Sequence, residues 1–275
     1  EADNYHLDIA VKNVTKGEIL LEAKDVVKHF GGVHAVDGIS VQFKAGEVHG
    51  IIGPNGSGKS TLISALTRYH ELTSGSVVLL GAEADKKPFK VARNGVTRVF
   101  QIPHLFERVS VLDNVLTGMY RRDKYSIFDA ILRTPRYLKA NSRSVAEAKA
   151  LLSLAGMLGM EELAAGSISH GQKRLLEVIR AVATEPKILI LDEPATGLTQ
   201  DEMHSLTSLI RTLAAGGMCV VLIEHNVAFL MDLADIVTVI QNGKVIAEGT
   251  PKEVQKNERV LEAYLGNTDF SKELA

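Results

Sequence analysis

The sequence Gly53-Pro54-Asn55-Gly56-Ser57-Gly58-Lys59-Ser60-Thr61 has the form G-x-x-x-x-G-K-[ST], which is typical of loops that bind the phosphates of a nucleotide. The apolar run Val48–Ile52 before it predicts a buried strand. The residues after the loop predict a helix with Leu62, Leu66 and Tyr69 on one face. Because this motif works between a strand and a helix, we favour a nucleotide site over a chance glycine-rich turn.

The residues of this loop suit the chemistry of phosphate binding. Glycine accepts a positive φ and lets backbone N–H groups approach phosphate oxygens, and the N-terminus of the following helix adds positive potential. We expect Lys59 to hold the β- and γ-phosphates, Ser60 to ligate Mg²⁺ and Thr61 to contact phosphate. The expected nucleotide contacts of the loop are Gly53, Asn55, Gly56, Ser57, Gly58, Lys59, Ser60 and Thr61.

The composition of the 275 residues narrows the class of protein. The net charge is −2 and there is no Trp, so neither a broad basic surface nor a set of base-stacking rings is evident, and nucleic acid is not expected as a partner. The single cysteine, Cys219, lies in an apolar run and is expected to be a buried thiol. No apolar run approaches the ~18 residues that a bilayer requires, and the acidic start lacks signal-peptide features. A cytoplasmic chain is expected.

Strand patterns flank the loop. Ile19–Phe30 and residues 39–43, joined through Gly31-Gly32, alternate as strands do, and residues 76–80 predict another strand, which together indicate an antiparallel layer. Later apolar runs at residues 187–191 and Cys219–Ile223, with a helix at 202–213 between them, predict a buried parallel sheet.

The end of the chain has its own signals. Ile236–Gln241, Asn242-Gly243 and residues 244–248 predict a β-hairpin with a type I′ turn. A helix is expected at about 251–265.

Residues from about 103 to 180 have helical patterns and predict an insertion in the core. Residues 144–154 and the stretch up to Ala165 are expected to be helical, with breaks at Pro135, Gly156 and Gly159. A basic cluster, Arg121, Arg122, Lys124 and Arg133, fits either anionic lipid or a solvated helix face, and we favour the solvated face. The domain organisation expected is a tail at 1–17, one domain at 18–265 and a second tail at 266–275.

Two acids follow a buried strand in Ile188-Leu189-Ile190-Leu191-Asp192-Glu193. In a protein with a phosphate loop on a neighbouring strand, this position faces the Mg²⁺ ion. We expect Asp192 to hold the metal through water, and Glu193 to orient and polarise the attacking water. The alternative, acids that only cap a helix, is less favoured because the loop is also present.

Four other positions are candidates with plain structural alternatives. Ser169-His170-Gly171-Gln172, the signature segment, has the S-x-x-Q form of a capping box, and a helix start of this kind also presents N–H groups to an anion. Gln101 and His225 follow predicted strands, where open α/β sheets bind ligands. Phe30 fits either the core or a ring on which adenine stacks.

The order of these elements over residues 18 to 265 resembles an ABC transporter ATP-binding subunit. That order is the phosphate loop, Gln101, the signature segment, Leu191-Asp192-Glu193-Pro194 and His225. Within the family, the sequence is most similar to the ATP-binding subunits of branched-chain and hydrophobic amino-acid importers. The residues that carry this closer likeness are Phe100-Gln101-Ile102-Pro103-His104-Leu105-Phe106, the insert after Gly118, Ile223-Glu224-His225-Asn226 and Ala263-Tyr264-Leu265-Gly266.

The resemblance implies a fold and a set of roles. The fold is α/β, a P-loop NTPase core with a mainly parallel sheet, an antiparallel β subdomain and a helical insertion. Phe30 would stack on adenine, and His225 would contact the γ-phosphate. Gln101 would join Asp192 and Ser60 at Mg²⁺ and couple that site to the membrane subunit. Ser169, Gly171 and Gln172 would close on the ATP of a second ATP-binding subunit, either a copy or a sister chain, arranged head to tail.

The resemblance also implies partners and a location. The partners would be integral membrane permease subunits and, indirectly, an extracytoplasmic solute-binding protein, and the chain would lie peripherally on the cytoplasmic side of the membrane. Two positions depart from the family pattern: His170 replaces a Gly, and Thr199 stands where many members have Asp. The alternatives left open are the ATPase subunit of a lipid or lipopolysaccharide exporter and a soluble, non-transport ABC protein.

Overall fold

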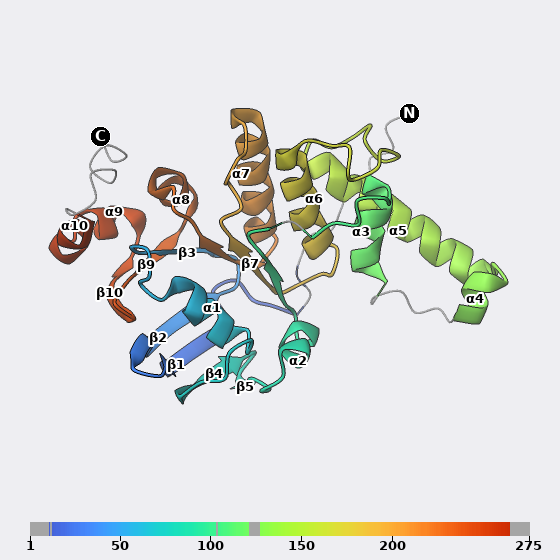
Figure 1. The fold of residues 1–275 in the computed structure, drawn as a ribbon. Coiled ribbons are helices and arrows are strands. Elements are labelled where there is room, and N and C mark those ends of the chain that lie inside the picture. The colour runs from blue at the N-terminus through green and yellow to red at the C-terminus, as the bar shows by residue number, and fades with distance from the viewer. Residues whose placement is uncertain (1–10, 12, 103, 121–126, 265–275) are drawn as a thin grey trace. The chain divides into compact units, whose positions relative to one another are not determined.

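The computed structural model describes residues 11, 13–102, 104–120 and 127–264 (Figure 1). The chain divides into two compact units, each described by itself. The sheet unit comprises Ala10–Arg98, Lys187–Pro194 and Ile210–Ala275, and the helical unit, in its described part, comprises Val99–Pro186 and Ala195–Leu209.

The sheet unit contains two β-sheets. One is antiparallel, in the order β2-β1-β4-β5, and is formed by β1 (Ile19–Phe30), β2 (Val33–Lys44), β4 (Ser74–Leu79) and β5 (Ala82–Glu83). The other is mainly parallel, in the order β10-β9-β3-β8-β7-β6, and is formed by β3 (Val48–Ile52), β6 (Val96–Val99), β7 (Ile188–Asp192), β8 (Cys219–Ile223), β9 (Ile236–Gln241) and β10 (Lys244–Gly249).

The sheet unit contains α1 (Lys59–Leu66), α2 (Pro88–Arg93), α8 (Val227–Leu233), α9 (Pro251–Gln255), α10 (Glu258–Tyr264) and the end of α7 (Gln200–Ala215). Helices α8, α9 and α10 contact strands of the parallel sheet. One apolar cluster joins α1 to both sheets, with Leu62 and Leu66 packed together with Val26 of β1 and Val221 of β8. Helix α8 lies against β3, since a Cβ at Gly50 would meet the Leu230 side chain. Residues of β3, β7 and β8 are therefore all buried.

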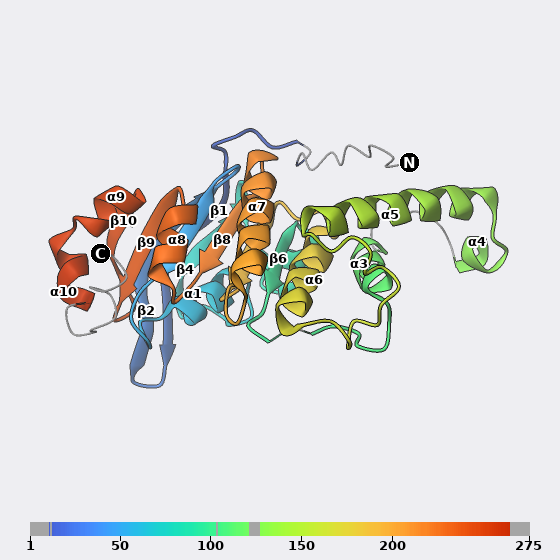
Figure 2. The ribbon, with the colours of Figure 1, turned by 90° about the horizontal axis from the view of Figure 1, so that it is seen from above.

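The helical unit is built from α3 (Val111–Met119), α4 (Ile127–Ile131), α5 (Pro135–Leu154), α6 (His170–Val182) and the first part of α7 (Gln200–Ala215). Helix α3 packs against both α5 and α6. In both views α4 lies at the end of α5 that is far from α6 (Figure 2). Of the described helices, none is long and apolar enough to cross a membrane.

Most predicted elements are present, and the fold class is confirmed. Strand Cys219–Ile223 and the predicted antiparallel layer occur as expected, although β2 starts at Val33, six residues earlier than predicted. At the hairpin between β9 and β10, Asn242 and Gly243 have φ of 49° and 76°, the positive values that a type I′ turn requires. Cys219 is a buried free thiol, and burial raises its pKa.

Several predicted helix limits are wrong. Pro135 does not break a helix but occupies the first position of α5, where its missing N–H costs nothing, and Thr134 caps it. The stretch from Gly156 to Ala165 is not helical, because Gly156 has a φ of 68° and the N–H of Met157 bonds back to the carbonyl of Leu152, which closes α5.

Two further corrections concern α1 and the end of the chain. Tyr69 lies beyond α1 and is exposed. The helix expected at 251–265 is two short helices, α9 and α10, separated at Lys256-Asn257, and Leu265 lies outside the described residues. The tail at 266–275, Arg121, Arg122 and Lys124 lie outside them too, as does most of the tail at 1–17.

Gly118 allows a test of the close contact between α3 and α6. A Cβ there would lie 2.4 Å from the carbonyl oxygen of Arg180 and 3.0 Å from Cβ of Ala183. Overpacking of this kind costs about 1–3 kcal/mol, against about 1 kcal/mol that Ala gains over Gly in helix propensity. Gly118→Ala should therefore lower the urea midpoint of unfolding, while Gly32→Ala, where no atom lies within 4 Å, should not. Equal midpoints for the two variants would contradict this account.

Candidate functional site

The phosphate loop joins β3 to α1 and is held on both sides by backbone. A Cβ at Gly58, where φ is 108°, would lie 2.2 Å from the carbonyl oxygen of Ala35 in β2. A Cβ at Gly53 would lie 2.0 Å from the carbonyl oxygen of Ile240 in β9. Glycine is required at both positions because any side chain would push β2 or β9 away. The predicted glycines therefore set the loop between two strands that are distant in sequence.

Lys59 lies over the loop. Its ammonium is buried and donates hydrogen bonds to the carbonyl oxygens of Gly53 at 2.6 Å and Pro54 at 3.1 Å. Burial lowers the Lys59 pKa, while the charges of Glu193 and Asp192 act to raise it, so both carboxylates lie close enough to act on the ammonium. A cation held in this way is available for phosphate.

The start of α1 supplies hydrogen-bond donors for an anion. The first N–H groups of a helix have no acceptor inside the helix, and Gly58, which precedes α1, has no side chain with which to cap them. The Ser57 hydroxyl is buried, and no hydrogen-bond partner for it lies within the described part of the chain. N–H groups, a buried hydroxyl and an ammonium are the donors that a phosphate chain needs, so the loop fits ATP.

Asp192 and Glu193 follow β7 at the edge of the sheet where the phosphate loop begins. The register pairs Ile223 with both Ile51 and Asp192, so the carboxyl ends of β3, β8 and β7 lie next to one another. Asp192 is buried at this edge. Glu193 has a φ of 51°, an unusual backbone conformation, and its N–H bonds to the Ile223 carbonyl at 2.8 Å. The backbone therefore fixes the direction of the Glu193 side chain.

His225 lies against Glu193. The distance from His225 Nε2 to Glu193 Oε1 is 2.7 Å, and the two side chains are 51% and 15% exposed. The structure thus brings together two residues that the sequence proposed independently. The imidazole is therefore positioned to orient the carboxylate of Glu193, the predicted base.

Arg98, which pairs with Asp192, was not predicted from the sequence. Arg98 Nη2 lies 2.7 Å from Asp192 Oδ2, both side chains are about nine-tenths buried, and Nη1 donates to the Ser64 hydroxyl at 3.2 Å. Arg98 lies in β6, far from Asp192 in sequence, and only the order of strands in the sheet makes them neighbours.

The oxygen atoms at this edge of the sheet are suitable ligands for a magnesium ion. Mg²⁺ binds carboxylate and hydroxyl oxygens, and the charge of Asp192 reaches the ammonium at the start of α1, the helix that carries Ser60. Arg98 occupies one carboxylate oxygen of Asp192. The predicted ligands Asp192 and Ser60 are therefore chemically suited to the metal.

Phe30 ends β1 and is 45% exposed. The Phe30 and His70 rings form a T-shaped pair with 5.3 Å between centroids, and the Lys28 ammonium lies over the Phe30 ring, 4.9 Å from its centroid. The exposed part of the Phe30 ring suits the predicted stacking on a base.

The signature segment opens α6 in the helical unit, as predicted. Ser169 caps the helix: its hydroxyl accepts from the N–H of Gln172 at 3.0 Å, and the Gln172 side chain accepts from the N–H of Ser169 at 2.9 Å. A Cβ at Gly171 would lie 2.0 Å from a carboxylate oxygen of Glu202. The predicted capping box is confirmed, and Gly171 leaves room for an acid at the helix start.

Glu202 is the second residue that sequence reasoning missed. Its Oε1 accepts from the Ser169 hydroxyl at 2.9 Å, and its Oε2 accepts from the N–H and the hydroxyl of Thr199 at 2.9 and 3.1 Å. Burial alone would raise the Glu202 pKa, but these hydrogen bonds and nearby His170 together lower it. An ionised carboxylate therefore sits at the start of α6.

Gln101 lies in the helical unit, in a segment tied to α6. The buried Arg174 donates to the Phe100 carbonyl and pairs with Glu177 at 3.1 Å, and Glu177 accepts from the N–H of His104 at 3.1 Å. Gln101 itself is exposed. No sequence pattern indicates this buried pair, which links the Gln101 segment to the helix that the signature opens.

The predicted residues thus fall into two groups. Phe30, the phosphate loop, Asp192, Glu193 and His225 are in the sheet unit, and Gln101, Ser169, Gly171 and Gln172 are in the helical unit.

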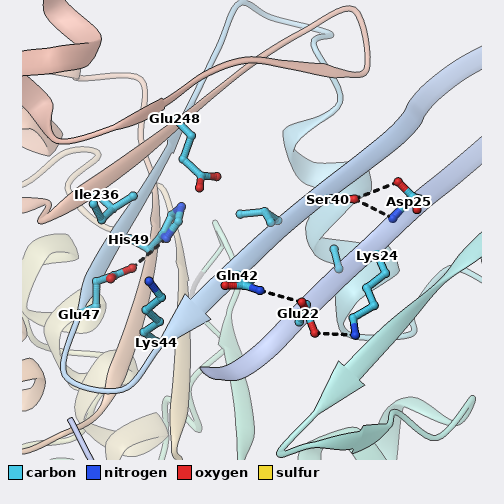
Figure 3. Close-up of a pocket in the computed structure, with 12 residues that line it drawn as sticks. Glu22, Lys24, Asp25, Ser40, Gln42, Lys44, Glu47, His49, Ile236 and Glu248 are labelled. Atoms are coloured by element: carbon cyan, nitrogen blue, oxygen red, sulfur yellow. Dashed lines mark hydrogen bonds and ion pairs between the residues drawn. The ribbon is translucent and has the colours of Figure 1, made fainter. Parts of the chain in front are cut away.

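A pocket of about 470 Å³ in the sheet unit contains none of the predicted residues (Figure 3). At one side, buried His49 bonds through Nδ1 to Glu47 at 3.1 Å and through Nε2 to the Thr238 hydroxyl at 2.8 Å, and Thr238 donates to Glu248. Other lining groups also bond to one another, as Gln42 does with Glu22. The polar groups of this pocket mainly satisfy each other, which indicates a structural role.

His29, His34 and Asp37 bring three potential metal ligands within 4.8 Å of one another. The two imidazole rings are stacked, with centroids 3.8 Å apart and an angle of 22° between planes. Ring nitrogens bind metals in the plane of the ring, and in nearly parallel rings these directions do not converge. Asp37 also pairs with Lys244 at 3.3 Å. This cluster is therefore not a formed metal site.

Comparison with protein families matches the chain to two models. Residues 36–196 match the family described as ABC transporter, and residues 244–269 match the family described as branched-chain amino acid ATP-binding cassette transporter.

Individual relatives are similar over almost their full length. The high-affinity branched-chain amino acid transport ATP-binding protein LivG of Salmonella typhimurium is 35% identical over 249 residues, which is 90% of this chain and 98% of that protein. The protein BraF of Pseudomonas aeruginosa is 34% identical over the same shares of each chain. A probable LivG of Methanocaldococcus jannaschii is 32% identical, over 90% of this chain and 97% of its own.

Solved structures of ATP-binding cassettes are also similar to this chain over almost their full length. A nucleotide-free ATP-binding cassette from an ABC transporter has a TM-score of 0.76 and 31% identity, over 90% of this chain and 99% of its own. The ADP conformation of an ATP-binding cassette of an ABC transporter has a TM-score of 0.77 and 32% identity, over 91% and 100%.

The lowered pKa of Glu202 allows a test of the acid at the start of α6. A carboxylate whose pKa is below its ordinary value, near 4.5, stabilises the fold above that pH, and the stabilisation is lost as pH falls through the lowered value. Glu202→Gln should therefore lower the melting temperature at pH 7, and the difference from wild type should shrink below about pH 4.

The matched control is Glu162→Gln, an exposed position with no side-chain partner among the described residues. It should leave the melting temperature unchanged at both pH values. A Glu202→Gln difference that is the same at pH 7 and at low pH would contradict the hydrogen-bonded carboxylate.

Proposed function

Because the chain belongs to the ABC transporter ATP-binding family, we propose that it binds and hydrolyses ATP to energise a transporter that imports branched-chain or other hydrophobic amino acids. The observation that carries the proposal is the junction of β3, β8 and β7, where the Lys59 loop, Asp192 and the Glu193–His225 pair meet. The named relatives and the match of residues 244–269 support the amino-acid substrate. No specific observation favours the lipid-exporter alternative.

ATP binding rests on the sheet unit. The N–H groups at the start of α1 and the Lys59 ammonium receive the phosphates, and Phe30 offers its exposed ring to adenine. In binding, Lys59 exchanges its two carbonyl acceptors for phosphate oxygens, which carry more negative charge. Ser60 and Asp192 would supply oxygen ligands to Mg²⁺, which would neutralise charge on the β- and γ-phosphates.

Hydrolysis rests on Glu193 and His225. The Glu193 carboxylate accepts a proton from water as the water oxygen attacks the γ-phosphorus and the bond to the bridging oxygen breaks. His225 holds the carboxylate in one orientation through the 2.7 Å contact, and its imidazole would offer a hydrogen bond to the γ-phosphate. The backbone bond from Glu193 to Ile223 keeps the base at this place.

The signature segment acts on a different ATP molecule. One chain has one phosphate loop and one α6, and the resemblance pairs each loop with the signature of a second subunit, head to tail. ATP would then close two chains, and hydrolysis would let them open. The helical insertion, at about 103–180, transmits this motion to permease subunits on the cytoplasmic side of the membrane. The solute-binding protein is reached only through the permease.

Glu193→Gln keeps the size of the side chain and removes the base. General-base catalysis contributes roughly 10²–10⁴-fold, so the ATPase rate should fall by that order while ATP binding remains. The measurement is the rate of phosphate release, with equilibrium binding of Mg-ATP on the same protein. Lys59→Ala is the matched control, which should lose ATP affinity instead, and wild-type hydrolysis by Glu193→Gln would show that Glu193 is not the base.

A mixture of two inactive variants tests the head-to-tail arrangement. Ser169→Arg places a bulky cation at the start of α6 and should block closure, while its own phosphate loop stays intact. In a dimer with a Lys59→Ala chain, one composite site carries both defects and the other carries neither. Mixing should therefore restore part of the ATPase activity that each variant lacks alone.

The control for this experiment is each variant at the total concentration of the mixture. A site contained within one chain cannot be rescued by mixing. Wild-type hydrolysis by Ser169→Arg alone would contradict the role given to the signature segment.

A further inference from the structure

The hairpin segment, residues 127–143, contains α4 and the first part of α5 and has a defined internal structure. The Thr134 hydroxyl donates to Asp129 at 3.0 Å and caps α5 by accepting from the N–H of Tyr137. Backbone bonds run from Leu132 to Phe128 and from Thr134 to Asp129. The turn between the two helices is therefore fixed by hydrogen bonds.

Large apolar side chains of this segment are exposed. Phe128, Ile131 and Leu132 are 74%, 71% and 73% exposed, and Leu138 is 50% exposed. Positions 128, 131 and 132 recur at helical spacing and share one side of the turn. The buried residues of α5 are Ser144, Ala148, Leu151 and Leu152, all in its second part. The hairpin segment therefore presents an apolar surface that the described part of the helical unit does not cover.

The hairpin segment is basic in an acidic chain. It contains four basic residues and one acidic residue, a net charge of +3, whereas the whole chain has a net charge of −2. Arg136, Lys139 and Arg143 follow one another at helical spacing along α5. Arg143 pairs with Glu147, but for Arg133, Arg136 and Lys139 no ion pair occurs within the described residues. The one acid, Asp129, already accepts from Thr134.

We propose that the hairpin segment docks on the surface of a membrane that contains anionic phospholipid, an inference that rests on the proposed function as a transporter subunit. Apolar rings and branched chains flanked by exposed Arg and Lys are the composition of helices that lie at a bilayer interface. The apolar groups enter the acyl boundary, while the long basic side chains extend to the phosphates.

Lipid phosphates match this surface better than fixed carboxylates do. The exposed cations lie at three separate positions, and none of them has an ion-pair partner within the part of the chain that the structure describes. Lipid phosphates can move laterally to meet them. A solvated helix face, the interpretation favoured for the basic cluster in the sequence, accounts for the charges. It does not account for the four exposed apolar side chains. A permease protein is the other partner of a transporter subunit, and the test separates it from lipid.

The test is flotation of the purified full chain with protein-free vesicles. Vesicles of phosphatidylcholine that contain phosphatidylglycerol should carry the chain, and vesicles of phosphatidylcholine alone should not. Each basic residue near an anionic surface contributes about fivefold to partitioning, so Arg136→Glu/Lys139→Glu should reduce it by roughly 25-fold or more. Added salt should have the same effect, because it screens exposed charges.

Matched controls separate the effect of the hairpin segment from the effect of net charge and of exposed apolar residues elsewhere on the chain. Lys86→Glu/Lys256→Glu makes the same change in net charge at exposed positions of the sheet unit and should float as wild type does. Phe128→Ser/Leu132→Ser should lose flotation, while Phe89→Ser, at a 53% exposed ring of the sheet unit, should keep it.

Three results would overturn the inference. The first is equal flotation of the hairpin and control variants, and the second is flotation that does not depend on anionic lipid. The third is that the hairpin variants float normally but no longer co-purify with a permease. Mg-ATP binding, measured on the same proteins, keeps the two proposals apart. A wild-type chain that binds no ATP would overturn the proposed function, whereas lost flotation with ATP binding intact supports the hairpin assignment.

Discussion

The parallel register of β3, β8 and β7 is the constraint on which the candidate site depends. Backbone hydrogen bonds along these strands set Ile51, Ile223 and Asp192 at the same level of the sheet. The chain leaves each strand close to that level, so the phosphate loop, Glu193 and His225 all begin from one edge of the sheet. A slip of one register position would turn the Asp192 side chain to the other face of the sheet.

The loop then depends on close backbone packing at this edge. The carbonyls of Ala35 and Ile240 approach the α-carbons of Gly58 and Gly53 too closely for any side chain. Lys59 bonds back to the loop through the Gly53 and Pro54 carbonyls, so its ammonium is positioned by the same backbone. The charges of Asp192 and Glu193 then act on an ammonium with little freedom to move. Binding groups that are already in place cost less conformational entropy when a phosphate arrives.

The sequence predicted what local patterns determine. The phosphate loop, the Asn242-Gly243 turn and the capping box at Ser169 each depend on residues within a few positions of one another, and each is present. Helix limits were less predictable, as at Pro135, because a proline breaks a helix in its interior and favours one at its first position. The pairs Arg98–Asp192 and Arg174–Phe100 join residues 94 and 74 positions apart, and no local pattern indicates them.

The two departures from the family pattern, at His170 and Thr199, have a common structural explanation in Glu202. Thr199 donates both its N–H and its hydroxyl to the Glu202 carboxylate, and the charge of His170 favours the ionised form. An Asp at position 199 would offer no hydroxyl donor and would place a second carboxylate beside the first, where like charges raise each other's pKa. A Gly at position 170 would remove the nearby imidazole. Thr199 and His170 are therefore matched to an acid at the start of α6, and the acid in turn holds the Ser169 hydroxyl. Both departures from the family pattern therefore act on the Glu202 carboxylate within the helical unit. A substitution at either position should act by changing the hydrogen bonds or the charge around Glu202.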